Sequence, residues 1–114
     1  MKKLITLLAC GVVSLNAVAG GNVASGEALA KKYSCAACHG ADYNKPIDPS
    51  YPKLAGQYAD YLAHALVAYK RGDGPNGRNN AIMTGQVKPL SDRDIADIAA
   101  YLGSLPAGVA IGHR

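Results

Sequence analysis

The chain has 114 residues, enough for one small domain. Its formal net charge is +4 and its basic residues form no dense run, so nucleic-acid binding is not indicated. It has no Trp and no Phe but 13 Gly and 6 Pro, so bulky apolar side chains are scarce for so small a core. We therefore expect something besides side chains to fill the middle of the fold.

The first predicted element is an export signal over residues 1–19. Two lysines near the start precede a mostly apolar run, which ends in an A-x-A cleavage site at Ala19. The run is short for a membrane span. We expect cleavage after about Ala19, a mature domain over residues 20–114 that does not span a membrane, and a location in the periplasm. An uncleaved anchor and a lipoprotein modified at Cys10 are the alternatives.

Removal of the signal changes both the charge and the cysteine count. It takes away two lysines and no acid, which lowers the net charge from +4 to +2. It also takes away Cys10 and leaves Cys35 and Cys38 as the only cysteines. The remaining chain then begins with a predicted helix over about residues 25–34. Ser25 is expected as its N-cap, with Glu27 in the first turn.

The next feature is Cys35-Ala36-Ala37-Cys38-His39, which matches the pattern for attachment of a c-type haem. Each thiol can form a thioether bond with one haem vinyl group. Two intervening residues in a helical turn let both sulfurs reach neighbouring vinyls. His39 then falls beneath the iron and can ligate it. The motif therefore predicts one covalent haem c, with His39 as an axial ligand of its iron.

Three other interpretations of this motif stay open. A redox dithiol of the thioredoxin kind would need a βαβ context, which the pattern does not show. A structural zinc site would need four ligands, and the only other histidines are His64 and His113. A plain disulfide between Cys35 and Cys38 would not require His39.

A proline-rich loop is predicted over residues 40–55, and a helix from Gly56 to about Arg71. Apolar and tyrosine side chains recur on this helix at steps of three and four residues, which indicates one buried face: Tyr58, Tyr61, Leu62, Ala65, Leu66 and Tyr69. His64 falls off this stripe and is expected to face solvent. Glycine and asparagine residues predict a second loop over 72–80.

Met83 is the only methionine left after the signal is removed. We place it in the loop before the last helix, where its thioether can supply the second axial ligand of the iron. The alternatives are that Met83 fills the core or that His64 is the second ligand.

The last predicted helix starts after Ser91, with Asp94 placed for a capping box. Ile95, Ile98, Ala99, Leu102 and Leu105 form its expected buried stripe, and Pro106 ends it. No segment alternates as a strand does, so the sequence predicts a single all-α domain.

Taken in order, these motifs make residues 22–106 resemble the class I c-type cytochromes, in particular the short bacterial periplasmic branch with one haem. The resemblance implies a small fold of three to four helices around one covalently bound haem. Some relatives carry two haems in a duplicated domain, and this chain would correspond to one half of such a protein. The segments that carry the resemblance are CAACHG, YPKLAGQY, YLAHALVAYKRG, GRNNAIM and LSDRDIADIAAYLGSL.

The resemblance also implies roles for individual residues. Cys35 and Cys38 would carry the thioether bonds, His39 would be the proximal ligand and Met83 the distal ligand. The carbonyl of Pro52 would accept a hydrogen bond from Nδ1 of His39, Tyr101 would lie where the last helix crosses the first at Gly26, and Arg78 is a candidate partner for a haem propionate.

These features predict an electron carrier and not an enzyme: a one-electron shuttle between a respiratory donor and a terminal oxidase or reductase. The resemblance names the cytochrome bc complex or a dehydrogenase as donor. We expect transient redox partners, no nucleic acid and a monomer. The alternatives are a haem subunit of a fixed dehydrogenase complex, and a haem sensor or enzyme in which Met83 is a labile ligand.

Overall fold

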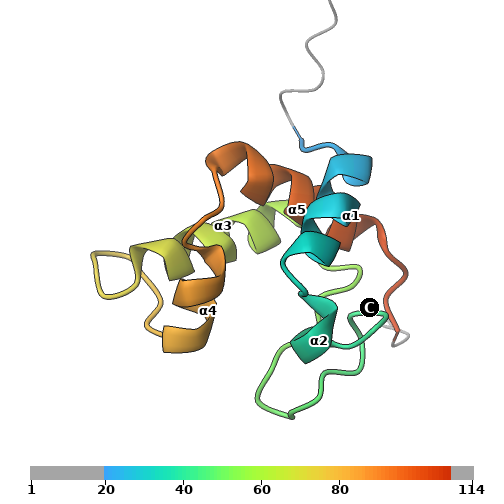
Figure 1. Ribbon diagram of the computed structural model, residues 1–114, viewed down its shortest axis with the longest axis horizontal. Helices are drawn as coiled ribbons and strands as arrows, with labels where there is room; N and C mark the ends of the chain where they lie inside the picture. Colours follow the sequence, from blue (N-terminus) through green and yellow to red (C-terminus); the bar gives the residue numbers. More distant parts are fainter. Residues whose placement is uncertain (1–19, 109–114) are drawn as a thin grey trace, which may run out of the picture.

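The computed structural model describes residues 20–108, which form an all-α domain with no strand among them. The predicted signal and its cleavage site lie outside the described residues, as does His113. Five helices follow one another in the described part (Figure 1): α1 (Val23–Lys32), α2 (Ala36–His39), α3 (Ala59–Arg71), α4 (Ala81–Val87) and α5 (Asp92–Ser104). The all-α fold predicted from the sequence is confirmed.

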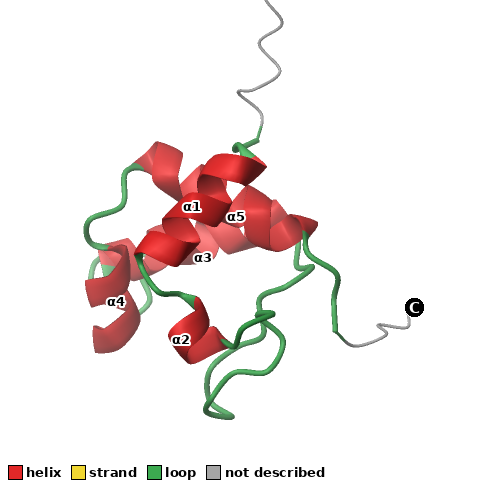
Figure 2. Ribbon diagram, turned by 45° about the vertical axis from the view of Figure 1, so that its right-hand side comes forward, coloured by secondary structure: helices red, strands yellow, loops and turns green. Residues whose placement is uncertain are grey.

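Helices α1 and α5 cross and form the centre of the domain (Figure 2). The crossing is close because Gly26 has no side chain: a Cβ there would lie 1.9 Å from the carbonyl oxygen of Asp97 and 2.8 Å from Cβ of Tyr101. Only glycine allows the two backbones to approach so closely. The crossing of Gly26 and Tyr101 is the one that the resemblance implied.

The start of α1 differs from the prediction. Asn22, not Ser25, is the N-cap, and its side-chain oxygen accepts a hydrogen bond from the amide of Ser25 at 2.8 Å. Glu27 therefore lies beyond the first turn, where it pairs with Lys31 at 3.6 Å. Both Asn and Ser are good N-caps, so local preference alone does not choose between Asn22 and Ser25. Gly21 lies against the backbone of α5, which starts the helix early.

Helix α5 begins as predicted. The Ser91 hydroxyl accepts a hydrogen bond from the amide of Asp94, and the Asp94 carboxylate accepts one from the amide of Ser91, so the capping box is complete. Four of the five predicted stripe residues are buried, and Leu105 is half-buried. Asp97 is also buried, and it accepts a hydrogen bond from the backbone amide of Asn22 at 2.7 Å.

Helix α3 packs against α5, but its buried face is narrower than its sequence pattern indicates. Leu62 is buried, whereas Tyr58 is 86% exposed and Tyr61 is 48% exposed. The helix begins only at Ala59, so Tyr58 serves as its N-cap. The prediction that Tyr58 and Tyr61 belong to the buried face is wrong: Tyr58 precedes the helix, and both side chains are exposed among the described residues.

The buried apolar side chains form one small cluster among the helices and the loop before α3. Its members include few large residues, as the composition predicts: Ala30, Tyr43, Ala55, Leu62, Val87, Leu90, Ile95, Ile98, Ala99 and Leu102. Within residues 20–108, no helix has the length and apolar character needed to cross a membrane.

Candidate cofactor site

The Cys-x-x-Cys-His motif occupies a tight turn and the short helix α2. After α1 ends, Ser34 adopts a left-handed backbone conformation with φ of 55°, which turns the chain toward α2. The amide of Cys35 donates a hydrogen bond to the carbonyl of Ala30, so the motif is fixed to the end of α1. The helical turn brings Cys35 and Cys38 to the wall of one cavity, and both are free, half-buried thiols. Burial raises the pKa of the Cys35 thiol.

His39 is 7% exposed, and its ring orientation is fixed by the backbone. Its Nδ1 lies 2.9 Å from the carbonyl oxygen of Pro52, the contact that the resemblance implied. A carbonyl only accepts hydrogen bonds, so Nδ1 carries the proton and Nε2 keeps the lone pair that can bind a metal. Such a hydrogen bond fixes the tautomer and raises the basicity of the ligand.

The loop over residues 40–55 brings Pro52 back to His39. Gly40 turns the chain with φ of 97°, and a Cβ there would lie 2.4 Å from the carbonyl oxygen of Lys45. The carbonyl of Tyr43 then accepts hydrogen bonds from the amides of Leu54 and Ala55. The loop is therefore folded against its own start, which explains how a residue 13 positions away reaches the imidazole.

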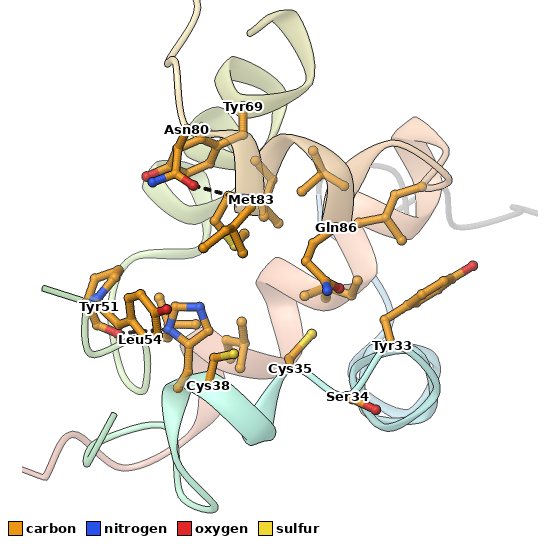
Figure 3. A pocket seen from close by; sticks show the side chains of 18 of the residues that line it. Tyr33, Ser34, Cys35, Cys38, Tyr51, Leu54, Tyr69, Asn80, Met83 and Gln86 are labelled. Carbon is orange, nitrogen blue, oxygen red and sulfur yellow. Dashed lines mark hydrogen bonds between the residues drawn. The ribbon is translucent and has the colours of Figure 1, made fainter. Parts of the chain in front are cut away.

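Met83 lies on helix α4, not in a loop, so that part of the prediction is wrong. Asn80 caps the helix: its side-chain oxygen accepts a hydrogen bond from the amide of Met83 at 3.0 Å. A helix of only seven residues is too short to be stable alone, so its local sequence pattern does not predict it. Met83 lines the cavity from this helix, across from Cys35 and Cys38 (Figure 3).

The cavity joins all these groups and measures about 920 Å³, including the part open to solvent. Its lining contains no charged side chain, and apolar and aromatic groups form most of it. Its sulfur and imidazole groups are two thiols, one thioether and one histidine ring, a set that fits a covalently bound haem with two axial ligands.

Several lining residues were not singled out from the sequence: Tyr33, Tyr51, Tyr69, Asn80 and Gln86. The ring of Tyr51 is tilted by 44° to the ring of His39, with their centroids 6.2 Å apart. Asn80 carried a usable signal, because an asparagine three residues before Met83 is a good N-cap. Tyr69 enters the cavity from α3; its place on the helical stripe predicted burial but not contact with the site.

Arg78 and His64 do not line the cavity. His64 is exposed on α3, as predicted. The guanidinium of Arg78 lies over the rings of Tyr61 and Tyr69 and donates a hydrogen bond to the Tyr61 hydroxyl at 3.2 Å. This hydrogen bond raises the pKa of Arg78. Within the described residues, no group of three or more His, Cys, Asp or Glu comes together, as a zinc site would require.

Comparison with known proteins gives one consistent result. The sequence profile of the family described as cytochrome c matches residues 23–106. The chain is 42% identical to cytochrome c4 of Stutzerimonas stutzeri over 95% of this chain and 52% of that protein. It is 48% identical to cytochrome c-554(548) of Halomonas halodenitrificans over 74% of this chain and 96% of that protein.

A third relative is named thiosulfate dehydrogenase electron acceptor, from Thiomonas intermedia. It is 36% identical over 95% of this chain and 46% of its own length. The crystal structure of reduced recombinant cytochrome c4 from Pseudomonas stutzeri matches with a TM-score of 0.69 and 41% identity, over 78% of this chain and 48% of that one. The chain thus spans about half the length of the cytochrome c4 relatives that it matches.

Proposed function

This chain belongs to the cytochrome c family, whose cofactor is a covalently bound haem c with its iron, and from this premise we propose that it is a one-electron carrier of the periplasm. When bound, the haem supplies the Fe(II)/Fe(III) couple. We further propose that this chain holds a single haem, because it contains one Cys-x-x-Cys-His motif.

One observation carries the proposal: a single cavity is lined by the two thiols, the buried imidazole and the thioether. Cys35 and Cys38 are assigned the thioether bonds. His39 is assigned the proximal position, with its ring held by Pro52. Met83 is assigned the distal position. With both axial positions taken, no site remains for a substrate, and this favours electron transfer over oxygen chemistry.

The residues around these ligands support a carrier. A methionine ligand raises the reduction potential, and an apolar lining tunes it further by excluding water. The hydrogen bond from His39 to Pro52 and the cap on α4 hold the two ligands on separate elements, so both can stay in place when the charge on the iron changes. A contact between Arg78 and a haem propionate stays a prediction.

The partners are proposed to be redox proteins that bind transiently to a monomer. Ile82 is 57% exposed and belongs to the cavity lining, so the rim offers an apolar contact. Weak encounters of this kind use small interfaces. The relative named as an electron acceptor of thiosulfate dehydrogenase favours a dehydrogenase as donor over a cytochrome bc complex. A terminal oxidase or reductase is the proposed acceptor.

A mass measurement on the protein purified after export tests the cofactor, the copy number and the signal together. We expect the mass of residues 20–114 plus one haem that resists acidified organic solvent. A colourless protein, or a pigment that such solvent extracts, refutes the proposal. A stable partner that co-purifies with the chain points instead to a fixed complex.

Carbon monoxide tests whether the iron is closed. We expect the oxidised optical spectrum to contain a methionine–iron band, and the reduced protein to bind carbon monoxide slowly and weakly at neutral pH. Ready binding overturns the carrier and supports a sensor or enzyme with a labile sixth ligand.

A further inference from the structure

The segment over residues 78–90 carries Met83 and is attached to α3 by hydrogen bonds at its start, in its middle and at its end. The bonds join the Arg78 amide to the Ala68 carbonyl at 2.8 Å, the Thr84 hydroxyl to the Tyr69 carbonyl at 2.9 Å, and the Lys70 ammonium to the Leu90 carbonyl. Helix α4 within this segment packs chiefly against α3. Because α4 has seven residues, its stability has to come from these contacts.

The side chain of Arg78 adds a further attachment at the start of the segment. Its Cζ lies 5.4 Å from the ring centroid of Tyr69 and 5.7 Å from that of Tyr61, both within the distance of about 6 Å at which a cation attracts a ring face. Its Nη2 also donates a hydrogen bond to the Tyr61 hydroxyl at 3.2 Å. The guanidinium therefore joins two points on α3 that are about two helical turns apart.

The attachment leads directly to the cavity. Asn80 follows Arg78 by two residues and caps α4 through the amide of Met83. In Figure 3, Tyr69 and Asn80 are both drawn above Met83. All three line the cavity, whereas Arg78 and Tyr61 stay outside it. Arg78 thus contacts Tyr69 from outside the cavity, and it fixes the chain two residues before the capping residue Asn80.

We infer that Arg78 is a positioning residue, and that its contacts with Tyr61 and Tyr69 hold Met83 in place beside the cofactor. This inference rests on the proposed function, since it takes Met83 as the distal ligand. It gives Arg78 a different role from the propionate contact that the resemblance implied. Without the contacts, α4 separates more often from α3 and the thioether leaves the iron by local unfolding.

Imidazole binding to the oxidised, haem-loaded protein measures this opening, because imidazole can take the distal position only when Met83 has left it. Arg78→Ala is expected to raise the apparent affinity for imidazole on the order of tenfold, since two cation–ring contacts and a hydrogen bond are lost. Arg78→Lys keeps the charge but not the planar stacking, so its imidazole affinity is expected to lie between those of the wild type and Arg78→Ala. Arg71→Ala removes an exposed arginine from the end of α3 and serves as the matched control.

A double-mutant cycle separates this role from a propionate contact. Tyr61 does not line the cavity, so a propionate role for Arg78 predicts that the effects of Arg78→Ala and Tyr61→Ala on imidazole affinity add. The positioning role predicts that Tyr61→Ala alone raises the affinity and that the double variant gains little more. Additive effects, or an Arg78→Ala variant that binds imidazole like the Arg71→Ala control, overturn the inference.

Amide hydrogen exchange distinguishes a failure of this inference from a failure of the proposed function. A wild-type protein with no methionine–iron band refutes Met83 as ligand, whatever the variants do. In either case, Arg78→Ala is expected to speed exchange at the amides of residues 78 and 84 while α1 and α5 keep their protection. Unchanged exchange at these two amides refutes the contacts, and faster exchange throughout the domain shows a general stabilising role instead.

Discussion

At the scale of single residues, the proposed ligand Met83 is expected to close the distal side of the iron. Met83→Ala is expected to keep the covalent cofactor and to lower the reduction potential by a sizeable part of the ~0.8 V range that axial ligands span. It also opens the iron to added ligands. Spectra and potentiometry of the purified variant measure both effects. An oxidised spectrum identical to that of the wild type would rule Met83 out as a ligand.

Tyr43 is expected to make the folded state less stable at alkaline pH. It is 4% exposed, and burial raises its pKa from 10.0 to about 12. The folded state therefore holds the proton more tightly than the unfolded state, so this contribution is complete below pH ~10 and is lost as the pH rises toward ~12. Tyr43→Phe is expected to lose less stability than the wild type between these values, measured as the midpoint of denaturant unfolding.

Tyr58→Phe is the control for Tyr43, because the ring of Tyr58 is exposed and the same change there leaves the alkaline loss of stability as it was. Equal losses in the Tyr43→Phe variant and the wild type would show that burial of the Tyr43 hydroxyl has no part in the effect.

The residues of the attachment motif were the easiest to find, because their chemistry depends on adjacency. Cys35, Cys38 and His39 are within one helical turn of one another, so the spacing alone places them on one wall. Tyr69 and Tyr51 could not be found this way. Each reaches the cavity through the fold, by a helix packing or a returning loop, and a single sequence does not record such contacts.

At the scale of secondary-structure elements, the cap of α1 gives a direct comparison. Asn22→Ala removes the observed cap and is expected to cost about 0.5–2 kcal/mol of unfolding free energy. Ser25→Ala alters only the residue that donates its backbone amide, so its effect is expected to stay within about 0.5 kcal/mol. Denaturant titration of both variants measures the difference. The opposite order would restore Ser25 as the cap.

The crossing of α1 and α5 depends on the absence of a side chain. Gly26→Ala puts a Cβ into the backbone of α5, and neither backbone can move freely, so we expect a loss of about 1–3 kcal/mol. Gly85→Ala is the matched control: a Cβ there meets nothing within 4 Å, and its helical position predicts a gain of about 0.5–1 kcal/mol. Thermal unfolding compares the two variants. Equal stability of both would show that the crossing is not close in solution.

The predicted elements were right where local sequence signals were strong, and wrong where packing against other helices determines the structure. The capping box of Ser91 and Asp94 is local, so α5 begins as predicted. Helix α4 is stabilised by α3, and a pattern of seven residues with a glycine near its end does not show that support. The exposed end of α3 is the reverse case, since its tyrosines keep a helical spacing although Tyr58 is exposed.

At the scale of the whole molecule, the cofactor is expected to be part of the core. The fold buries few large apolar side chains around a cavity of about 920 Å³, which includes space open to solvent. Loss of the cofactor would therefore leave the side chains that line the cavity without packing partners. The double variant Cys35→Ala with Cys38→Ala is therefore expected to yield little folded protein. Circular dichroism and yield after export measure this, and a well-folded double variant without haem would contradict it.

The sequence by itself determined the all-α class and predicted the haem chemistry proposed for Cys35, Cys38 and His39, because helix periodicity and the attachment spacing are properties of neighbouring residues. The tertiary structure alone decided that Met83 lies on a helix, that Tyr51 and Tyr69 reach the cavity, and that Arg78 faces two tyrosine rings outside the cavity. The reason is physical: these contacts join segments far apart in the chain, and their energies arise only once the helices have packed.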